Sequence, residues 1–468
     1  QVDLERRVAA LEAQVKQLMV AMEDCNVCSA AKPHVSHLQR HLYENALVVL
    51  RKVRRQVQPS LLQSVHQALL GFFAQLADDV SRDAHNADAV AEPLPLPSTL
   101  ISVLNELRWH ASASPLAVAN GGALSVLLDV VDKSAELSDG EEAAEISLAV
   151  FQLVIAASAE ARSDFLKRGG LPAVVKAVQS SPESVLLAEA ATRLLVEFGG
   201  SEADQANVVA AGGLEATVRA LARFPGDADL VALGGALLHT LLYFEKTAGE
   251  RAGRALEAGA VPALVEALRA NPASLEAEGH ALLLLEVLAR RMPAAVGEAV
   301  SAGMLPPLLR SLRTHGDQPE IAFSALMLLS HASDDSLTAR AVAASEAPHA
   351  VVAAMAAHGG DGFSEEEVQE AGLKALLALA NNGYAEQVLE AGGADAVVGS
   401  MRLHPKVPDV VKYAMSIAAA LCEASGEGKE AVCVAGVNSV LEASRVNCKR
   451  EDVAEAVKRV GEVCVCSV

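Results

Sequence analysis

Two cysteines and two histidines near the start of the chain are of the types that bind zinc. Cys25 and Cys28 stand three residues apart, and His34 and His37 follow at the same spacing. Only five residues separate Cys28 from His34, which is too few for the ββα unit of the usual zinc finger. We expect plain structural thiols here, with a metal site as the alternative, and we assign no metal and no cofactor.

A second stretch, Gly426-Glu-Gly428-Lys429-Glu430, superficially resembles a phosphate-binding loop. However, Glu423 occupies the position of the first glycine of that motif, and Glu430 the position of its Ser or Thr. No His-Glu-x-x-His, Gly-x-Ser-x-Gly or dinucleotide-binding pattern occurs. Four further histidines are scattered through the sequence: His280, His315, His331 and His358. We therefore expect no catalytic residues and no enzyme activity.

The concentrated basic run of this chain is Arg51-Lys52-Val53-Arg54-Arg55. Its four cations, Arg51, Lys52, Arg54 and Arg55, could contact an acidic partner or act as a weak nuclear-import signal, and a solvated helix face is the alternative. The whole chain has a formal net charge of −21, from 38 basic and 59 acidic residues. Because this charge repels phosphate backbones, we expect no general nucleic-acid binding.

Composition also bears on the compartment. The longest uncharged runs, such as 61–77 and 231–244, are shorter than a membrane span requires and carry polar residues. We therefore expect no membrane insertion. The seven cysteines lie towards the two ends of the chain, a pattern unlike a secreted disulfide framework, and no signal-peptide pattern is present. We expect a reducing, intracellular location, either cytoplasmic or cytoskeletal.

A short sequence motif that recurs along the chain predicts the helices that carry these residues. Arg168-Gly169-Gly170-Leu171-Pro172 has variants that recur every 43 to 48 residues. A glycine can adopt the left-handed conformation that ends a helix, and a proline suits the first turn of the next one. Each copy therefore predicts a helix end followed by a helix start. The eight anchor residues of these copies are Gly121, Gly169, Gly212, Gly259, Gly303, Glu346, Gly392 and Ala435.

Each junction is followed by the same pair of helical patterns. In one repeat, a short amphipathic helix over 263–270 leads through Asn271-Pro272 to a longer apolar helix over 275–290. The low aromatic content of 3% and the abundant alanine favour helices over strands. One such unit cannot bury its apolar faces alone, whereas stacked neighbours share a continuous core.

This unit resembles an armadillo repeat, with HEAT repeats as the close competitor. The resemblance covers roughly residues 98–463. It implies an all-α fold, a right-handed α-solenoid of about eight three-helix repeats. As a fold it is compatible with many binding roles, so function must be sought in what varies between the junctions.

The resemblance also implies where a partner binds. The third helices of armadillo repeats line a concave groove, and the peptide-transport members carry Trp and Asn there, four residues apart on one helix face. The corresponding positions of this chain contain no Trp and one Asn, which disfavours a nuclear-import receptor of the usual kind. The polar residues at these positions are our candidate partner-binding set: Arg193, Glu197, Thr240, His331 and Asn381. Solvated groove lining is the alternative interpretation.

The first residues of the chain predict a separate docking element. Apolar residues at a/d spacing indicate a short coiled coil or docking helix within residues 1–30, and self-association through residues 1–25. An amphipathic helix packed on the same protein is the alternative. The a/d positions include Leu4, Val8, Leu11, Val15 and Leu18.

The remaining divisions follow from composition. Residues 31–82 form a helical extension with the basic run, 83–97 a proline-rich linker, and 98–468 the solenoid. Two longer loops, 132–141 and 359–366, interrupt two repeats between their second and third helices. We expect these loops to be contact surfaces, with neutral insertion as the alternative.

The sequence therefore predicts a non-enzymatic protein–protein interaction scaffold, a structural component or adaptor of a multi-subunit assembly. The alternative is a transport or cargo adaptor that recognises an extended peptide in the groove. The alanine-rich and glycine-rich style of the repeats is similar to armadillo proteins of algal and protist cilia, which act as structural adaptors in axonemal complexes. That similarity implies a cilium or flagellum as the location.

Overall fold

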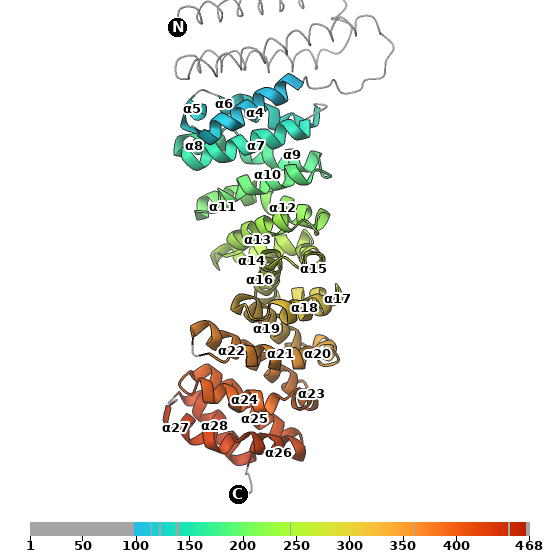
Figure 1. Ribbon diagram of the computed structural model, residues 1–468, viewed down its shortest axis with the longest axis vertical. Helices are drawn as coiled ribbons and strands as arrows, with labels where there is room; N and C mark the ends of the chain where they lie inside the picture. The colour runs from blue at the N-terminus through green and yellow to red at the C-terminus, as the bar shows by residue number, and fades with distance from the viewer. Residues whose placement is uncertain are drawn as a thin grey trace, which may run out of the picture. The chain divides into compact units, whose positions relative to one another are not determined.

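The computed structural model describes residues 98–464, apart from residues 114, 121–122, 137–139, 244, 361 and 448–449 (Figure 1). This part of the chain is helical and contains no strand. The predicted docking helix, helical extension, basic run, linker and candidate zinc ligands of residues 1–97 lie outside the described residues.

The chain divides into two compact units, with the boundary between Ala216 and Thr217. Within each unit, groups of three helices follow one another in stacked layers (Figure 1). The helices up to the boundary are α4 (Ser98–Ala113), α5 (Pro115–Asn120), α6 (Ala123–Asp132), the 3₁₀ helix η1 (Ser134–Glu136), α7 (Gly140–Ala157), α8 (Ala159–Lys167), α9 (Gly170–Ser180), α10 (Val185–Val196), α11 (Glu202–Ala210) and α12 (Gly213–Arg223), within which the boundary falls.

The second unit continues the same order of a first, a second and a longer third helix. Its helices are α13 (Ala228–Tyr243), α14 (Glu245–Glu257), α15 (Ala260–Ala270), α16 (Leu275–Arg291), α17 (Ala294–Ser301), α18 (Leu305–His315), α19 (Pro319–Asp334), α20 (Ser336–Ala343), α21 (Ala347–Ala357), α22 (Phe363–Asn381), α23 (Ala385–Glu390), α24 (Gly393–Leu403), α25 (Pro408–Ala424), α26 (Gly426–Ala435), α27 (Val437–Asn447) and α28 (Glu451–Val463). The third helices of the eight groups are α7, α10, α13, α16, α19, α22, α25 and α28. The predicted all-α fold of three-helix repeats is confirmed for the described residues.

Glycine forms the junctions between first and second helices as predicted. Gly259 has φ 87° and Gly392 φ 84°, a left-handed conformation that strains any residue with a Cβ atom. Where a second glycine follows, it allows close packing. A Cβ atom built on Gly393 would lie 2.5 Å from Cγ1 of Val388 in the preceding helix. The glycine pair therefore serves two purposes, a turn and a close helix contact.

The prediction for the last junction is wrong by one residue. The left-handed position there is Gly436, with φ 92°, and Ala435 is instead the last residue of α26. Glycine tolerates positive φ far better than alanine, so the turn forms at Gly436. Another junction has Glu346 in place of the glycine. Glu346 has φ −76°, and the following helix starts with Pro348 in its first turn.

Packing of third helices on one another makes up much of the core of the second unit. Here α16 packs against α13 and α19, and α22 packs against α19 and α25. Leucines such as Leu284 and Leu326 are fully buried in these contacts, and burial of each stabilises the fold by roughly 2 kcal/mol. In the first unit, α7 packs in the same way against α4 and α10.

The predicted loop at 359–366 is shorter in the structure, because α22 begins at Phe363. Glu365 and Glu366 lie in the first turn of this helix, where negative side chains interact favourably with the helix dipole. The second half of this segment, 363–366, therefore belongs to the helix. The loop at 132–141 contains η1 between α6 and α7.

Candidate interaction surface

The third helices present a second side that is not packed into the core. In the second unit, three half-buried apolar side chains occupy equivalent positions on neighbouring third helices: Leu283 on α16, Met327 on α19 and Leu377 on α22. We call these three residues the apolar row. One helical turn further along, on the same side of their helices, stand His331, which is half-buried, and Asn381, which is exposed. The equivalent residue of α16, Val287, is buried.

The candidate residues of the first unit lie on α10 and make local contacts. Arg193 is half-buried in the last turn of α10, and its guanidinium lies 3.7 Å from a carboxylate oxygen of Glu189. Glu197 follows α10 directly, and its carboxylate accepts a hydrogen bond of 3.5 Å from Nε2 of Gln152 on α7. Glu197 therefore links α10 to α7, whereas the ion pair of Arg193 lies within α10 itself.

The candidate residues of the second unit lie on three different third helices. Thr240 on α13 donates its hydroxyl proton to the carbonyl of Ala236 at 2.8 Å, so its hydroxyl serves its own helix. Asn381 is exposed at the end of α22. The next residue, Asn382, makes the inter-repeat contact instead, donating from Nδ2 to the carbonyl of Ser333 at 2.8 Å. Asn381 therefore stays a predicted partner-binding residue, whereas its neighbour Asn382, which the sequence pattern did not single out, joins two repeats.

His331 on α19 lies in a polar setting. Burial lowers its pKa, the carboxylates of Glu286 and Asp334 raise it, and the positive charges of Arg290 and Lys374 lower it. Glu286 and Arg290 form an ion pair at 3.2 Å on α16. Burial also raises the pKa of Asp334, which the neighbouring His331 opposes. This part of the face therefore holds charges of both signs around one imidazole.

Two histidines that the sequence analysis did not place on this face are His239 on α13 and His280 on α16. Both are half-buried. Burial lowers the pKa of His239, and the charges of His280 and Arg290 lower it further. The pKa of His280 is also lowered by burial, against the effect of Glu276. In the sequence, His280 is one of several scattered histidines. Its proximity to His239 is not visible there, because His239 belongs to the preceding repeat.

An aromatic and cationic group lies towards the other end of the second unit. The ammonium groups of Lys374 on α22 and Lys412 on α25 lie 5.4 Å and 5.6 Å from the ring centre of Tyr413. Both lysines are also ion-paired, Lys374 with Glu370 at 2.6 Å and Lys412 with Asp452 at 3.0 Å. The group therefore stabilises the packing of three neighbouring helices, and its cations are largely neutralised.

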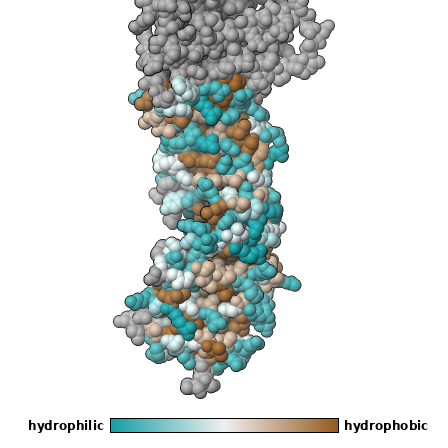
Figure 2. Space-filling view, viewed as in Figure 1, coloured by the Kyte–Doolittle hydropathy of each residue, from teal (hydrophilic) through white to brown (hydrophobic). Residues whose placement is uncertain are grey.

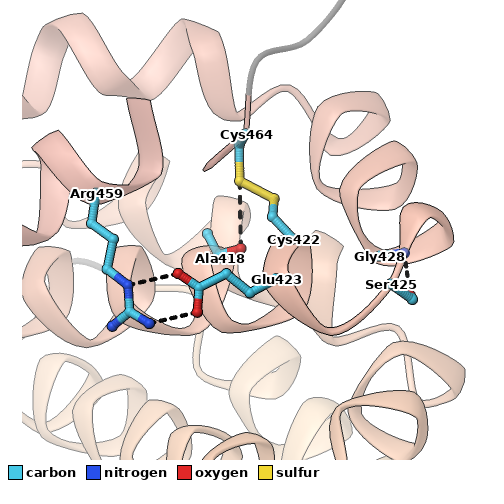
Figure 3. The surroundings of a disulfide bond; sticks show 7 residues. All are labelled: Ala418, Cys422, Glu423, Ser425, Gly428, Arg459 and Cys464. Atoms are coloured by element: carbon cyan, nitrogen blue, oxygen red, sulfur yellow. Dashed lines mark hydrogen bonds and ion pairs between the residues drawn. A yellow bond between two sulfur atoms is a disulfide. The ribbon is translucent and has the colours of Figure 1, made fainter. Parts of the chain in front are cut away.

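The described residues that resembled a phosphate loop have a structural role. Ser425 caps α26, accepting a hydrogen bond from the backbone N–H of Gly428 at 2.9 Å (Figure 3). A Cβ atom at Gly428 would lie 2.2 Å from the carbonyl oxygen of Leu421. Glycine is therefore required there for the close contact between α26 and α25.

A disulfide joins two described cysteines that the sequence analysis left unpaired. Cys422 on α25 and Cys464, which follows α28, have Cα atoms 5.8 Å apart (Figure 3). They are 42 residues apart in sequence, which is about the length of one repeat. This spacing could have predicted that the two cysteines lie close together in successive repeats. This bond is not what the expected reducing compartment predicts. Cys433 is also disulfide-bonded.

The surface carries no other obvious chemical centre within the described residues. No group of three or more His, Cys, Asp or Glu side chains there is arranged to hold a metal ion. Among the described helices, none is long and apolar enough to cross a membrane. On the face seen in Figure 2, hydrophilic residues are interspersed with smaller hydrophobic areas.

No family model and no curated protein matches the chain by sequence. Among solved structures, an engineered protein aligns with a TM-score of 0.52 and 18% identity, covering 79% of this chain and 96% of that one. A designed armadillo repeat protein in complex with the peptide (KR)4 aligns with a TM-score of 0.39 and 20% identity, covering 58% of this chain and 98% of that one. A structure from work on a phosphorylation switch between cadherin and β-catenin aligns at 0.49 and 15%, covering 79% and 81%.

At these identities the likeness concerns the fold alone. It agrees with the three-helix repeats and glycine junctions described above. The chain therefore has an all-α armadillo-repeat fold.

Proposed function

We propose that this protein is a non-enzymatic interaction scaffold that binds other proteins through the outer side of its third helices. The observation that carries this proposal is the apolar row, Leu283, Met327 and Leu377. Half-buried apolar side chains at one equivalent position of three neighbouring helices form a strip, and contiguous apolar strips with polar rims are common at protein interfaces.

Polar residues beside the row would supply specificity. His331 and Asn381 lie one turn from Met327 and Leu377 on the same helices. An apolar centre with a polar rim excludes water from the central contacts, while the rim selects partners by hydrogen bonds and charge. Arg193 and Glu197 would serve in the same way on α10 of the first unit.

The same row favours a second candidate, an adaptor that binds an extended segment. Packed helices are about 8–10 Å apart, and an extended chain advances about 3.3 Å per residue. A segment crossing the third helices would therefore place about every third residue opposite the next member of the row. Such an adaptor should bind a short peptide reversibly, whereas a scaffold should copurify with large folded partners in a stable complex.

The assembly is a further proposal. A ciliary or other cytoskeletal complex is favoured by the similarity in repeat style, and self-association is favoured by the a/d pattern of residues 1–25. The first of these proposals concerns the identity of the partners, and the second concerns residues outside the described part of the chain.

The proposed surface is tested by changing one member of the row. We expect Met327→Glu to reduce copurification of protein partners at least about tenfold, because a carboxylate at the centre of an apolar interface has to be desolvated. Tagged full-length chains, purified from cells and compared by quantitative mass spectrometry, give the measurement.

Leu337→Glu is the matched control. Leu337 is an apolar residue on the first helix α20 and is 83% exposed, so the same charge is introduced in the same unit but away from the third helices. Circular dichroism should show both variants folded. Equal partner recovery by Met327→Glu and wild type would overturn the proposed surface.

A further inference from the structure

His239 and His280 lie where two third helices of the second unit pack together. Gly235 stands one turn before His239 on α13, on the same side of the helix. A Cβ atom built on Gly235 would lie 2.5 Å from Cβ of His280 and 3.0 Å from its Cγ. His280 therefore occupies the space that a larger residue at position 235 would fill, and it lies directly against the backbone of α13.

The charged groups that act on the two imidazoles come from α16, where Arg290 is also ion-paired with Glu286 at 3.2 Å. From α16, Arg290 acts on His239 and Glu276 acts on His280. On α13 itself, the ring of Tyr243 lies 6.0 Å from the ring of His239. From α14, the buried Arg251 donates to the carbonyl of Leu241 at 2.8 Å, near the end of α13. Positive charge on His239 would thus meet that of His280 and Arg290. On His280, Glu276 offsets only part of the cost, because burial still lowers the pKa of His280.

We propose that the packing of His280 against Gly235, one turn from His239, makes this part of the third-helix face sensitive to pH: acidification charges both imidazoles, loosens α13 from α16 and weakens partner binding there. The consequence for binding rests on the proposed function. The loosening itself is a property of the chain alone and does not require a partner.

The burial of each ring determines whether acidification strengthens or weakens the packing of α13 on α16. Burial lowers both pKa values below the ordinary 6.5, so the unfolded or locally opened chain binds protons more readily than the packed form. The packing is therefore at full strength above pH 6.5 and weakens as the pH falls below that value. Glu276 favours the charged form of His280, so His280 protonates first, and its charge then lowers the pKa of His239.

His331 is a poorer probe of this effect. The pKa of its neighbour Asp334 is raised by burial, and proton uptake by that carboxyl stabilises the packed form at lower pH. The two changes oppose each other, so the test uses His239 and His280.

The first measurement is an NMR titration of the full-length chain with labelled histidine side chains. We expect the midpoint of His239 to lie below pH 6.5 in the wild type and to rise by about half a pH unit in His280→Gln, because the positive charge of His280 is removed. A His239 midpoint that does not move in this variant, or a wild-type midpoint at or above 6.5, would overturn the proposal.

The second measurement is hydrogen exchange of the partner-free chain at about pH 7.5 and about pH 5.5, corrected for intrinsic rates. We expect α13 and α16 to exchange several-fold faster at the lower pH, and the acceleration to be lost in the His239→Gln/His280→Gln double variant. An equal acceleration in that variant contradicts the proposal.

Two controls complete this experiment. His349→Gln changes an exposed histidine on α21 and should leave the acceleration intact. Gly235→Ala displaces His280 without changing charge, so it should speed exchange at both pH values. Because no partner is present, this result is independent of Met327→Glu, and failure of the pH response can be told from failure of the proposed function.

Discussion

At the scale of single residues, the glycine junctions explain why the repeats keep their spacing. Gly392 turns the chain between α23 and α24 with φ 84°, and Gly393 allows the close approach of Val388. Their repetition allows successive second helices to start in the same way, so variation elsewhere can alter the surface without altering the fold.

We expect Gly392→Ala to lower the free energy of unfolding by about 1–2 kcal/mol, because alanine is strained at positive φ. Gly399 provides the control in the same helix α24. It lies in the helix interior, and no atom lies within 4 Å of a Cβ atom built there. Gly399→Ala should therefore be neutral or stabilise by up to about 1 kcal/mol. Urea unfolding gives the free energy of unfolding of both variants. Equal changes in the two variants would contradict this role for Gly392.

The residues of the surface were only partly predictable. Periodicity placed Thr240, His331 and Asn381 on third helices, and the structure has them there. It could not show that Asn382 would bind Ser333, that Gly428 would pack on Leu421, or that His280 would pack on Gly235. Each of these contacts joins residues on different helices, so it depends on how the helices pack, which a linear pattern does not specify.

At the scale of elements, α28 is the last described helix and is held to α25 at both ends. At its start, Arg450 forms ion pairs with Asp409 and Asp452 at 2.8 Å each. At its end, Arg459 pairs with Glu423 at 2.6 Å (Figure 3), beside the disulfide. Among the described helices, α28 packs mainly on α25 and also contacts α27, so these links add directly to the contacts that hold it.

We expect the Cys422→Ser/Cys464→Ser double variant to unfold α28 more readily. In the chain-entropy view, closing a loop with a sequence separation of 42 is worth up to about 4 kcal/mol. Arg459→Gln, which removes the adjacent exposed ion pair and keeps the disulfide, should change stability by less than about 1 kcal/mol. Thermal melting followed by hydrogen exchange of α28 measures both. A larger effect of Arg459→Gln than of the cysteine variant would contradict this account.

The elements themselves were the most predictable part of the chain. The helix over 263–270 predicted from the sequence lies within α15, and the helix over 275–290 corresponds to α16. The sequence predicts a loop over 359–366, because these residues lengthen one repeat between its second and third helices. The structure instead starts α22 at Phe363, since Glu365 and Glu366 suit a first helical turn.

At the scale of the whole molecule, we expect partner binding and self-association to be separate properties. The third-helix face belongs to the described repeats, whereas the predicted a/d positions lie in residues 1–25. We expect Leu11→Asp/Val15→Asp in the full-length chain to reduce any self-association seen by light scattering at least about tenfold, because two charges enter the predicted seam. Partner recovery should be unchanged. An unaltered mass would contradict the coiled-coil prediction.

The central claim is that partners cover the outer side of the third helices. Hydroxyl-radical footprinting of the full-length chain, alone and with its copurified partners, tests it directly, because Met327 is both reactive and a member of the apolar row. We predict that partner binding lowers labelling of Met327 several-fold and leaves Leu337 and Val434 unchanged, two residues on first helices that are 83% and 81% exposed. Protection of Leu337 and Val434 with unchanged labelling of Met327 would contradict the account.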